Sequence, residues 1–187
     1  MRTLSFFIFS FLLGTVISNA QPDYDLKHWP EGKSPEEIGK RIAVKFINTP
    51  HTYYGNTHPE TPPVLVTYPD VCTWLGGLWF SKVTKDDDLR HQLEKRFTPL
   101  FTTEKNLQPK ANHVDHNVFG SVPLELYMQT KQQKYLDLGL YYADTQWTLP
   151  ENAKPEEKAW ADQGYSWQTR IWIDDMFMIT AVQVQAY

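Results

Sequence analysis

Two adjacent carboxylates, Asp174 and Asp175, lie within the otherwise apolar stretch RIWIDDMFMITAVQV. At helical spacing both acids have apolar neighbours, among them Ile171 and Met178, and no polar face emerges. The stretch is therefore predicted to form a helix buried in a core. Acids in the first turn of such a helix can cap free amides and interact favourably with the helix dipole. Alternatively, apolar walls raise the pKa of a carboxyl group, which suits a proton donor that works near neutral pH.

A second cluster of chemically active residues lies in the stretch NHVDHNVFG, which contains His113, Asp115 and His116. Imidazoles and a carboxylate can bind zinc or iron, but the histidine spacing is loose and no other histidine or cysteine cluster supports it, so we assign no metal and no cofactor. Asn112 or Asp115 can instead cap a helix. In a third interpretation Asp115 is the partner of the aspartate pair, because both clusters come at the starts of predicted inner helices.

Aromatic residues make up 14% of the chain and provide flat apolar surfaces that can stack on pyranose rings. A single aromatic residue is more often part of a core than part of a ligand site. Trp172 is favoured as a ligand contact because it lies two residues before Asp174. The predicted substrate-binding residues are Trp172, His116, Trp74 and Tyr68.

Apolar periodicity predicts helices along the chain and almost no strands. Ser34, Pro35 and Glu37 form a capping-box pattern at the start of the first helix. Gly76 and Gly77 are expected to let a neighbouring helix approach closely. The predicted helices cover residues 34–48, 70–84, 86–101, 115–130 with a kink at Pro123, 133–147 and 155–163, followed by a final helix that contains the aspartate pair.

Buried helices near residues 70, 115 and 171 alternate with more polar helices near residues 86 and 132. This alternation favours stacked helical hairpins, with inner helices that line a core and outer helices that face water. The predicted fold class is therefore all-α, of the (α/α)6-barrel type. A closed ring of six hairpins needs roughly 300 residues or more, at typical helix and loop lengths. A chain of 187 residues without a helix stop signal at its end is expected to form about half of such a toroid.

The first 20 residues are predicted to be a secretory signal peptide, because Arg2 precedes an apolar stretch that ends at Ser-Asn-Ala. Cleavage near Ala20 would give an exported protein without a membrane anchor. Loss of Arg2 changes the formal net charge from −4 to −5, which argues against a general nucleic-acid binder. The single cysteine, Cys72, lies in an apolar stretch and is expected to be a buried structural thiol.

Three stretches, YPDVCTWLGGLWF, HVDHNVFG and TRIWIDDMFM, resemble in their order and intervals the amino-terminal half of glycoside hydrolase families 88 and 105. These families are the unsaturated glucuronyl and rhamnogalacturonyl hydrolases. The resemblance covers most of residues 35–187, so residues 21–187 are identified as the amino-terminal part of an α/α-barrel glycoside hydrolase domain. The pattern W-x-D-x-[LM]-[FM]-M occurs here as WIDDMFM.

The resemblance implies an (α/α)6 barrel in which Asp174 is the catalytic acid/base and Asp115 is the aspartate that assists it. The implied substrates are oligosaccharides that carry a 4,5-unsaturated uronic acid at the non-reducing end, with rhamnogalacturonan-type substrates favoured. Asp174 would protonate C4 of the vinyl ether, water would add at C5, and the hemiketal would open and release the sugar. The alternatives are a non-catalytic helical carbohydrate-binding or scaffold protein and an inactive truncated fragment of the enzyme.

Overall fold

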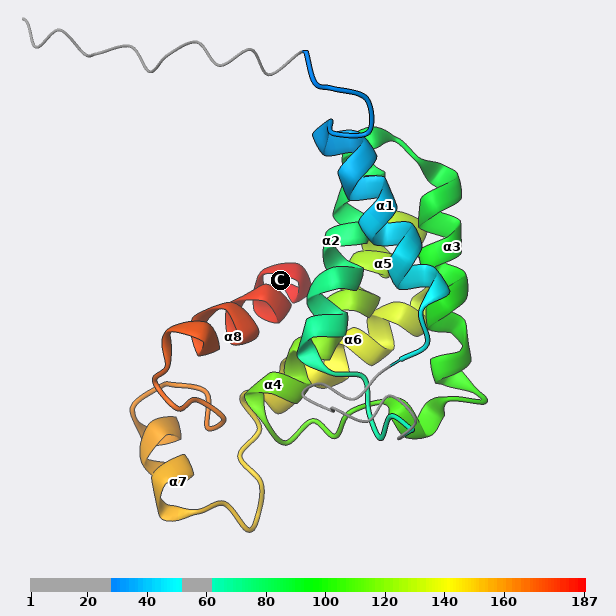
Figure 1. Cartoon of the computed structure of the whole chain (residues 1–187). Helices are drawn as coiled ribbons and strands as arrows, with labels where there is room; N and C mark the ends of the chain where they lie inside the picture. The colour runs from blue at the N-terminus through cyan, green and yellow to red at the C-terminus, as the bar shows by residue number, and fades with distance from the viewer. Residues whose placement is uncertain (1–27, 52–61) are drawn as a thin grey trace, which may run out of the picture.

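The computed structural model describes residues 28–51 and 62–187, and every regular element in this part of the chain is helical (Figure 1). The predicted all-α class is therefore confirmed, whereas the predicted signal peptide of residues 1–20 lies outside the described residues. The helices are α1 (Pro35–Asn48), α2 (Tyr68–Thr84), α3 (Asp87–Phe97), α4 (Val114–Asn117), α5 (Ser121–Thr130), α6 (Gln133–Thr145), α7 (Pro155–Asp162) and α8 (Ile173–Ala186), with 3-10 turns at Thr98–Phe101, Lys105–Leu107 and Val118–Gly120.

The first helix begins where the capping-box pattern predicts. The side chain of Ser34 accepts a hydrogen bond from the amide of Glu37 at 3.1 Å, and the amide of Ser34 donates to the Glu37 carboxylate at 3.1 Å. Two amides that lack partners inside the helix are satisfied in this way. Pro35 occupies the first turn, where a missing amide hydrogen has no cost.

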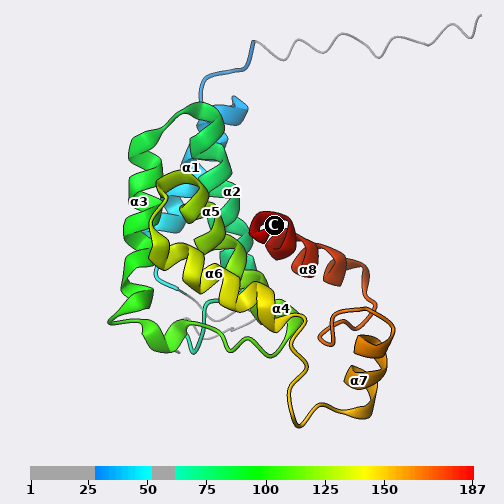
Figure 2. The ribbon, with the colours of Figure 1, turned by 180° about the vertical axis from the view of Figure 1, so that it is seen from behind.

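Helices α2 and α5 lie at the centre of the main helical body (Figures 1 and 2). Helix α2 packs against α1, α3 and α5, while α5 also packs against α6 and α8. Trp74 of α2 is fully buried and contacts Phe46 and Phe97 edge to face, with ring centroids 5.3 and 5.2 Å apart. Its indole Nε1 donates to the carbonyl of Leu93 at 3.1 Å. This aromatic core fixes α2 against both α1 and α3.

The stretch from 114 to 130 is not one kinked helix. It consists of the short helix α4, a 3-10 turn over Val118–Gly120 and then α5. Pro123 lies in the first turn of α5, where its missing amide leaves no helical hydrogen bond unmade. The predicted irregularity is present, but the chain changes course before the proline rather than at it.

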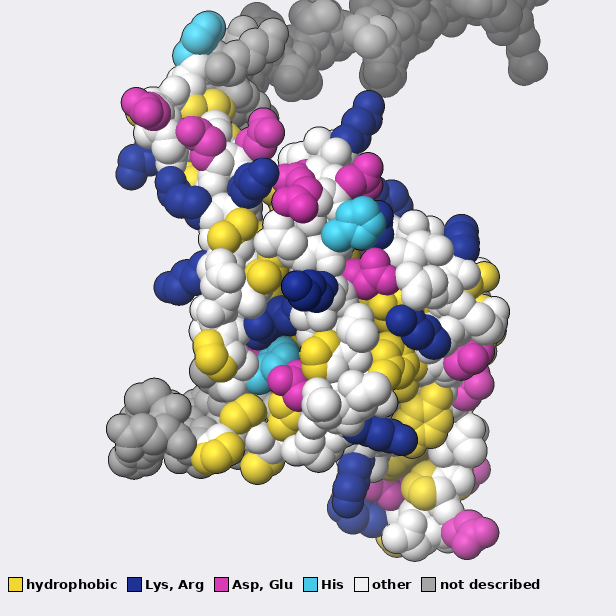
Figure 3. All heavy atoms as spheres, turned by 90° about the vertical axis from the view of Figure 1, so that its right-hand side faces the viewer, with side chains coloured by type: hydrophobic (Ala, Val, Ile, Leu, Met, Phe, Trp, Pro, Cys, Tyr) yellow, Lys and Arg dark blue, Asp and Glu magenta, His cyan; other side chains and the backbone are white. Residues whose placement is uncertain are grey.

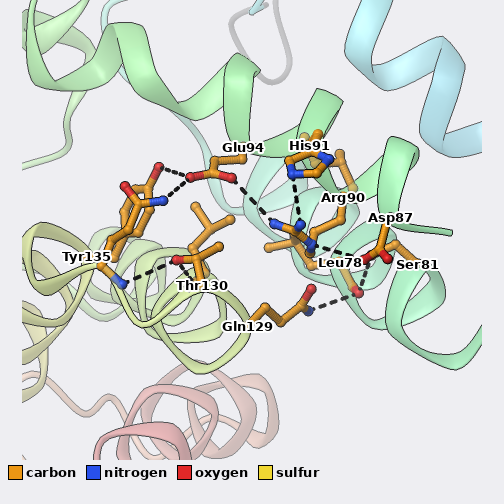
Figure 4. A network of polar contacts seen from close by, with 12 residues as sticks. Leu78, Ser81, Asp87, Arg90, His91, Glu94, Gln129, Thr130 and Tyr135 are labelled. Carbon is orange, nitrogen blue, oxygen red and sulfur yellow. Dashed lines mark hydrogen bonds and ion pairs between the residues drawn. The ribbon is translucent and has the colours of Figure 1, made fainter. Parts of the chain in front are cut away.

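A polar network joins α3 to the connection between α5 and α6 (Figure 4). The carboxylate of Glu94 accepts hydrogen bonds from the Tyr135 hydroxyl at 3.0 Å and from the Gln132 side chain at 2.6 Å. Its other oxygen lies 3.5 Å from Nη1 of Arg90. Burial and, after it, the Glu94 carboxylate raise the pKa of Tyr135, so the phenol stays protonated and remains a donor.

Figure 3 shows the face that lies on the right in Figure 1, with basic and acidic side chains interspersed. Along α3 the acidic residues Asp87 and Asp88 occupy the first turn, and the basic residues Lys95 and Arg96 occupy the last turn. Both placements are favourable to the helix dipole. Among the described residues, no helix combines the length and hydropathy needed to cross a membrane.

The final helix is only partly buried, so the prediction of a helix enclosed by the core is wrong. Helix α7 stands away from the main body in Figures 1 and 2, and α8 then returns to contact α5. The buried residues of α8 are Asp175, Met178 and Val182, whereas Ile173 is 85% exposed and Val184 is 79% exposed. Helix α8 is apolar on every side in sequence, yet it packs against the rest of the protein on one side only.

Two expectations for α2 are corrected. Cys72 is exposed on the helix surface rather than buried, because it faces away from the core that Trp74 and Leu75 enter. Gly77 does permit a close approach, since a Cβ atom there would lie 3.1 Å from Cδ1 of Leu93. Gly76 has open space around its Cβ position and plays no such role.

Two glycines give a matched test of the packing. Gly139→Ala is expected to lower the free energy of unfolding by about 1–3 kcal/mol, because the added methyl group would overlap the Leu124 side chain and lie 3.2 Å from the Leu124 amide nitrogen. Gly76→Ala is expected to raise stability by up to about 1 kcal/mol, since the helix there is exposed. Chemical denaturation of both variants measures the difference. Equal stabilities would contradict the close contact between α5 and α6.

Candidate functional site

The side chain of Arg170 joins the two acidic clusters. Its Nη2 donates to Oδ1 of Asp115 at 3.0 Å and to Oδ1 of Asp175 at 2.5 Å, and its Nε donates to Oδ1 of Asp175 at 3.1 Å. Oδ2 of Asp174 lies 3.9 Å from Nη2. One carboxylate oxygen from each aspartate lies within 4.8 Å of the other two. The structure therefore brings together Asp115 and the aspartate pair, as the third interpretation of the sequence expected.

The three acids come together because two helices begin beside each other. Asp115 lies in the first turn of α4, and Asp174 and Asp175 lie in the first turn of α8. Helices α4 and α8 are in contact. Positive dipole ends of both helices thus face the carboxylates, which is the favourable arrangement for negative charge.

A tight turn before α8 holds Arg170 in place. Oδ2 of Asp175 accepts hydrogen bonds from the amide of Arg170 at 2.6 Å and from the amide of Trp172 at 3.4 Å. Between them Ile171 has a φ of 60°, in the left-handed region that costs a β-branched residue on the order of 1–3 kcal/mol. The hydrogen bonds to Asp175 offset this cost and fix the direction in which the Arg170 side chain leaves the turn.

Asp175 is a buried structural acid, with only 2% of its side chain exposed. Burial alone acts to raise the pKa of Asp175, but hydrogen bonds from the Arg170 side chain and from the amides of Arg170 and Trp172 outweigh it and lower the pKa. The hydrogen bond to Asp175, together with the Asp115 charge, raises the pKa of Arg170. The pair is therefore ionised, and its function is to hold the turn. The capping interpretation of the sequence applies to this acid.

Asp174 differs from its neighbour because 52% of its side chain is exposed. The expected apolar walls do not enclose it: Ile171 is 57% exposed and Phe177 is 42% exposed, while Met178 is buried in the core. The prediction that Asp174 lies in a buried apolar setting is wrong. The consequence is that its carboxylate is open to solvent and to a ligand, beside the cation of Arg170.

Two histidines flank Asp115. His113 is the N-cap of α4, with Nδ1 accepting a hydrogen bond from the amide of Asp115 at 3.2 Å, so neither Asn112 nor Asp115 is the cap. His116 is half-buried, and its Nδ1 lies 3.3 Å from Oδ1 of Asn112. Burial and, after it, the neighbouring His113 lower the pKa of His116, which favours the neutral imidazole at pH 7.

The four predicted substrate-binding residues differ from one another in exposure and in their distance from the acids. Trp172 is 59% exposed and its ring lies under the guanidinium of Arg170, with 4.4 Å from Cζ to the ring centroid. His116 lies next to Asp115 in α4. Tyr68, the first residue of α2, packs against the core and is half-buried. Trp74 is 0% exposed and belongs to the core, so the prediction that it contacts substrate is corrected.

A pocket of about 480 Å³ lies beside the turn that carries Arg170. It takes its walls from the segment between α6 and α8 and from the first half of α8. Its lining combines aromatic and aliphatic side chains with hydroxyl groups and one carboxylate. The lining residues are Trp147, Gly164, Tyr165, Ser166, Thr169, Ile171, Trp172, Ile173, Asp175, Met176, Ile179 and Thr180.

Sequence reasoning missed two parts of this site. Arg170 opens the stretch RIWIDDMFM, and its position four and five residues before the two acids is the spacing at which a helical or turn-forming segment pairs opposite charges. That spacing could have identified it as the partner of the acids. The contribution of Trp147 and Tyr165 had no signal in the sequence, since α7 and its flanking loops separate the two residues from each other.

The three aspartates offer carboxylate oxygens of the kind that bind hard metal ions. Within the described residues, Asp115, Asp174 and Asp175 form a group of carboxylates close enough to bind one ion. The guanidinium of Arg170 already lies among them and donates to Oδ1 of Asp175, while the amides of Arg170 and Trp172 donate to Oδ2. We therefore continue to assign no metal to this cluster.

Comparison of the chain with protein-family models, with curated proteins and with solved structures found no match.

The two adjacent aspartates are expected to differ in their effect on stability. Asp175→Asn should lower the free energy of unfolding by about 1–3 kcal/mol, because it removes a charged acceptor of hydrogen bonds in a buried position. Asp174→Asn should change it by no more than about 0.5 kcal/mol, because that side chain is half exposed. Urea denaturation near pH 7 measures both.

The same pair has a predicted pH dependence. Since the pKa of Asp175 is lowered in the folded state, its contribution is fully present above the unfolded value of about 3.9 and is lost as the pH falls through the folded value. The stability difference between wild type and Asp175→Asn should therefore shrink below about pH 4. A difference that stays constant down to pH 2 would contradict the ionised pair.

Proposed function

We propose that this chain is the amino-terminal part of a carbohydrate-active hydrolase that removes a 4,5-unsaturated uronic acid from the non-reducing end of oligosaccharides left by polysaccharide lyases. Rhamnogalacturonan-type oligosaccharides are the favoured substrates. The observation that carries the proposal is the convergence of Asp115 and Asp174 on Arg170. These are the two acids that the resemblance to glycoside hydrolase families 88 and 105 singles out, and they come from separate helices.

The arrangement of the helices supports an incomplete (α/α)6-barrel toroid. Helices α2, α5 and α8 lie in contact in that order, and α1, α3 and α6 pack against them. An inner row with outer partners is what a series of helical hairpins produces. In such a fold the acids at the starts of α4 and α8 share one mouth of the ring.

In the proposed reaction Asp174 is the proton donor. It protonates C4 of the vinyl ether, and positive charge develops at C5 and the ring oxygen. A water molecule then forms the C5–O bond, and its surplus proton returns to a carboxylate of the site. The hemiketal that results opens and expels the remaining sugar. This differs from the ordinary attack at an anomeric carbon, although it too depends on two carboxylates with separate roles.

The neighbouring residues have distinct parts in this proposal. Half of the Asp174 side chain is exposed, so it can reach a bound sugar, whereas Asp175 is enclosed by Arg170 and by backbone amides. Asp115 is held by Arg170 at 3.0 Å and positions the water or the Asp174 carboxyl group. Trp172 forms a wall beside the reacting ring, with Arg170 packed on its indole.

The test is the loss of ultraviolet absorbance as the unsaturated uronyl bond is hydrated. Asp174→Asn is expected to reduce the rate by about 10²- to 10⁴-fold, as removal of a general acid does. Asp115→Asn should have the next largest effect. Asp87→Asn is the matched control, because Asp87 is an exposed first-turn aspartate on α3 and lies in a different part of the fold. Each variant is first checked for native circular dichroism.

Three results would count against the proposal. Full turnover by Asp174→Asn with loss of activity in a folded Asp175→Asn would mean that the motif register is off by one residue. Activity in all three site variants would make the acids structural. A wild-type protein that binds such oligosaccharides without turnover would favour the rival function, a non-catalytic helical carbohydrate-binding protein.

The sequence before Gln21 gives a proposal for localisation. We infer that residues 1–20 direct export and are removed, because a charged start, an apolar core and small residues before the cleavage point are the features of a signal peptide. Amino-terminal sequencing of protein secreted by a bacterial host should therefore begin near Gln21. Recovery of the exported protein with Met1 intact would contradict this.

A further inference from the structure

We propose that a pocket at the last turns of α1 and α3 is a binding site for a small organic monocarboxylate, with Arg96 and Lys95 as its cationic contacts. The pocket has a volume of about 590 Å³, within the range of about 300–1,000 Å³ that small-molecule sites occupy. None of the acids around Arg170 is among its described lining residues, so the inference does not rest on the proposed reaction.

Arg96 carries a positive charge that the described residues compensate only in part. Its guanidinium packs over the Phe46 ring at 4.3 Å, and Nη1 donates to the carbonyl of Ile47 at 3.0 Å, near the end of α1. Nε is enclosed and has no hydrogen-bond acceptor among the described residues. Burial lowers the pKa of Arg96, and the charges of Asp70 and Glu104 oppose this only from a distance. A half-buried guanidinium with five N–H donors is thus short of acceptors.

Nδ1 of His51 faces two groups that require opposite roles from it. It lies 3.3 Å from Oδ2 of Asp70 and 3.4 Å from Nη2 of Arg96. One ring nitrogen cannot donate to the carboxylate and accept from the guanidinium at the same time. A carboxylate oxygen bound in the pocket beside Nη2 removes this conflict, because Arg96 then donates to the ligand and His51 donates to Asp70. Both Arg96 and His51 line the pocket.

The formal charge of the lining selects a monoanion. Among the described lining residues the charged groups are two cations, Lys95 and Arg96, and one carboxylate, Glu104, which leaves one net positive charge with histidine counted as neutral. A single carboxylate neutralises this charge, whereas a phosphate dianion exceeds it and is repelled by Glu104. Charge-assisted hydrogen bonds from a guanidinium to a carboxylate are strong and directional, so they can orient the ligand.

The rest of the lining indicates an organic ligand rather than a bare inorganic ion. Apolar side chains make up much of it, and burial against them gives an apolar ligand body a gain in affinity that an inorganic ion lacks. The apolar lining residues are Ile47, Pro50, Pro63, Pro99 and Leu107. One end of the ligand therefore meets the cations, and its body meets the prolines and aliphatic side chains.

Benzoate and benzamide test the site, because they share one shape and differ in charge. Each is titrated at millimolar concentration into the full chain and followed in nuclear magnetic resonance spectra through the Arg96 Nε–H signal and the His51 ring. Benzoate should shift both, and benzamide should bind about tenfold or more weakly. In the benzoate complex Nδ1 of His51 should carry the proton donated to Asp70, which the nitrogen chemical shift reports. Inorganic phosphate should bind more weakly than benzoate.

Two variants change the charge of the lining in opposite directions. Lys95→Gln should weaken benzoate about two- to fivefold, and Glu104→Gln should tighten it by a similar factor. Lys82→Gln is the matched control, because Lys82 is an exposed lysine in the last turn of α2 that does not line the pocket. Neither lining variant alters the contact between Arg96 and Ile47, so binding is measured in a protein whose α1 and α3 remain joined.

Several results would overturn the site. These are equal binding of benzoate and benzamide, no shift at Arg96 or His51, and tighter binding of phosphate than of benzoate. Unchanged affinity in an Arg96→Gln variant with native circular dichroism would also overturn it, as would equal effects of Lys82→Gln and Lys95→Gln. Asp174→Asn should leave benzoate binding unchanged, and its loss of hydrolase activity bears only on the proposed reaction.

Discussion

The ion pair between Arg170 and Asp175 is the interaction on which the candidate site depends. It closes the turn before α8, holds Ile171 in the left-handed region and aims the guanidinium at Asp115. A buried carboxylate is costly to place unless its charge and lone pairs are all used, and Asp175 meets that condition. Without this pair, the start of α8 would lose its polar link through Arg170 to Asp115 of α4, and the two acids proposed for catalysis would be held together less firmly.

The neighbouring residues Asp174 and Asp175 have different roles. Asp175 is enclosed and serves the backbone, whereas Asp174, one residue earlier, projects to solvent at the edge of the same cation. Because the Asp175 carboxylate is fully hydrogen-bonded within the protein, it fixes the position of Asp174 and is not itself available to a ligand. Preorganisation of this kind is what an acid/base group needs, because a misplaced carboxyl loses most of its effect.

The site lies at the edge of a rigid body. Trp74, Phe46 and Phe97 lock α1, α2 and α3 together, and the network around Glu94 ties α3 to α6. Helix α8, by contrast, is packed on one side only, and its outer apolar residues are exposed. The acids therefore lie where the packed core meets a helix whose outer side is exposed. The pocket lined by Trp147, Tyr165 and Trp172 lies at the same boundary.

The sequence by itself determined the elements. Capping at Ser34, apolar spacing along α2 and acids in the first turn of α8 are local signals, because a helix begins and continues through contacts within a few residues. The sequence did not determine which of these residues are buried. Cys72, Trp74 and Asp174 all lie in apolar stretches, yet one is exposed, one is fully enclosed and one is half open. Which side of a helix meets a neighbour depends on contacts between residues far apart in the chain, so only the tertiary structure decided it. The same holds for Arg170, which the sequence analysis did not single out: its spacing is compatible with a pair within its own turn, but its second partner, Asp115, comes from α4.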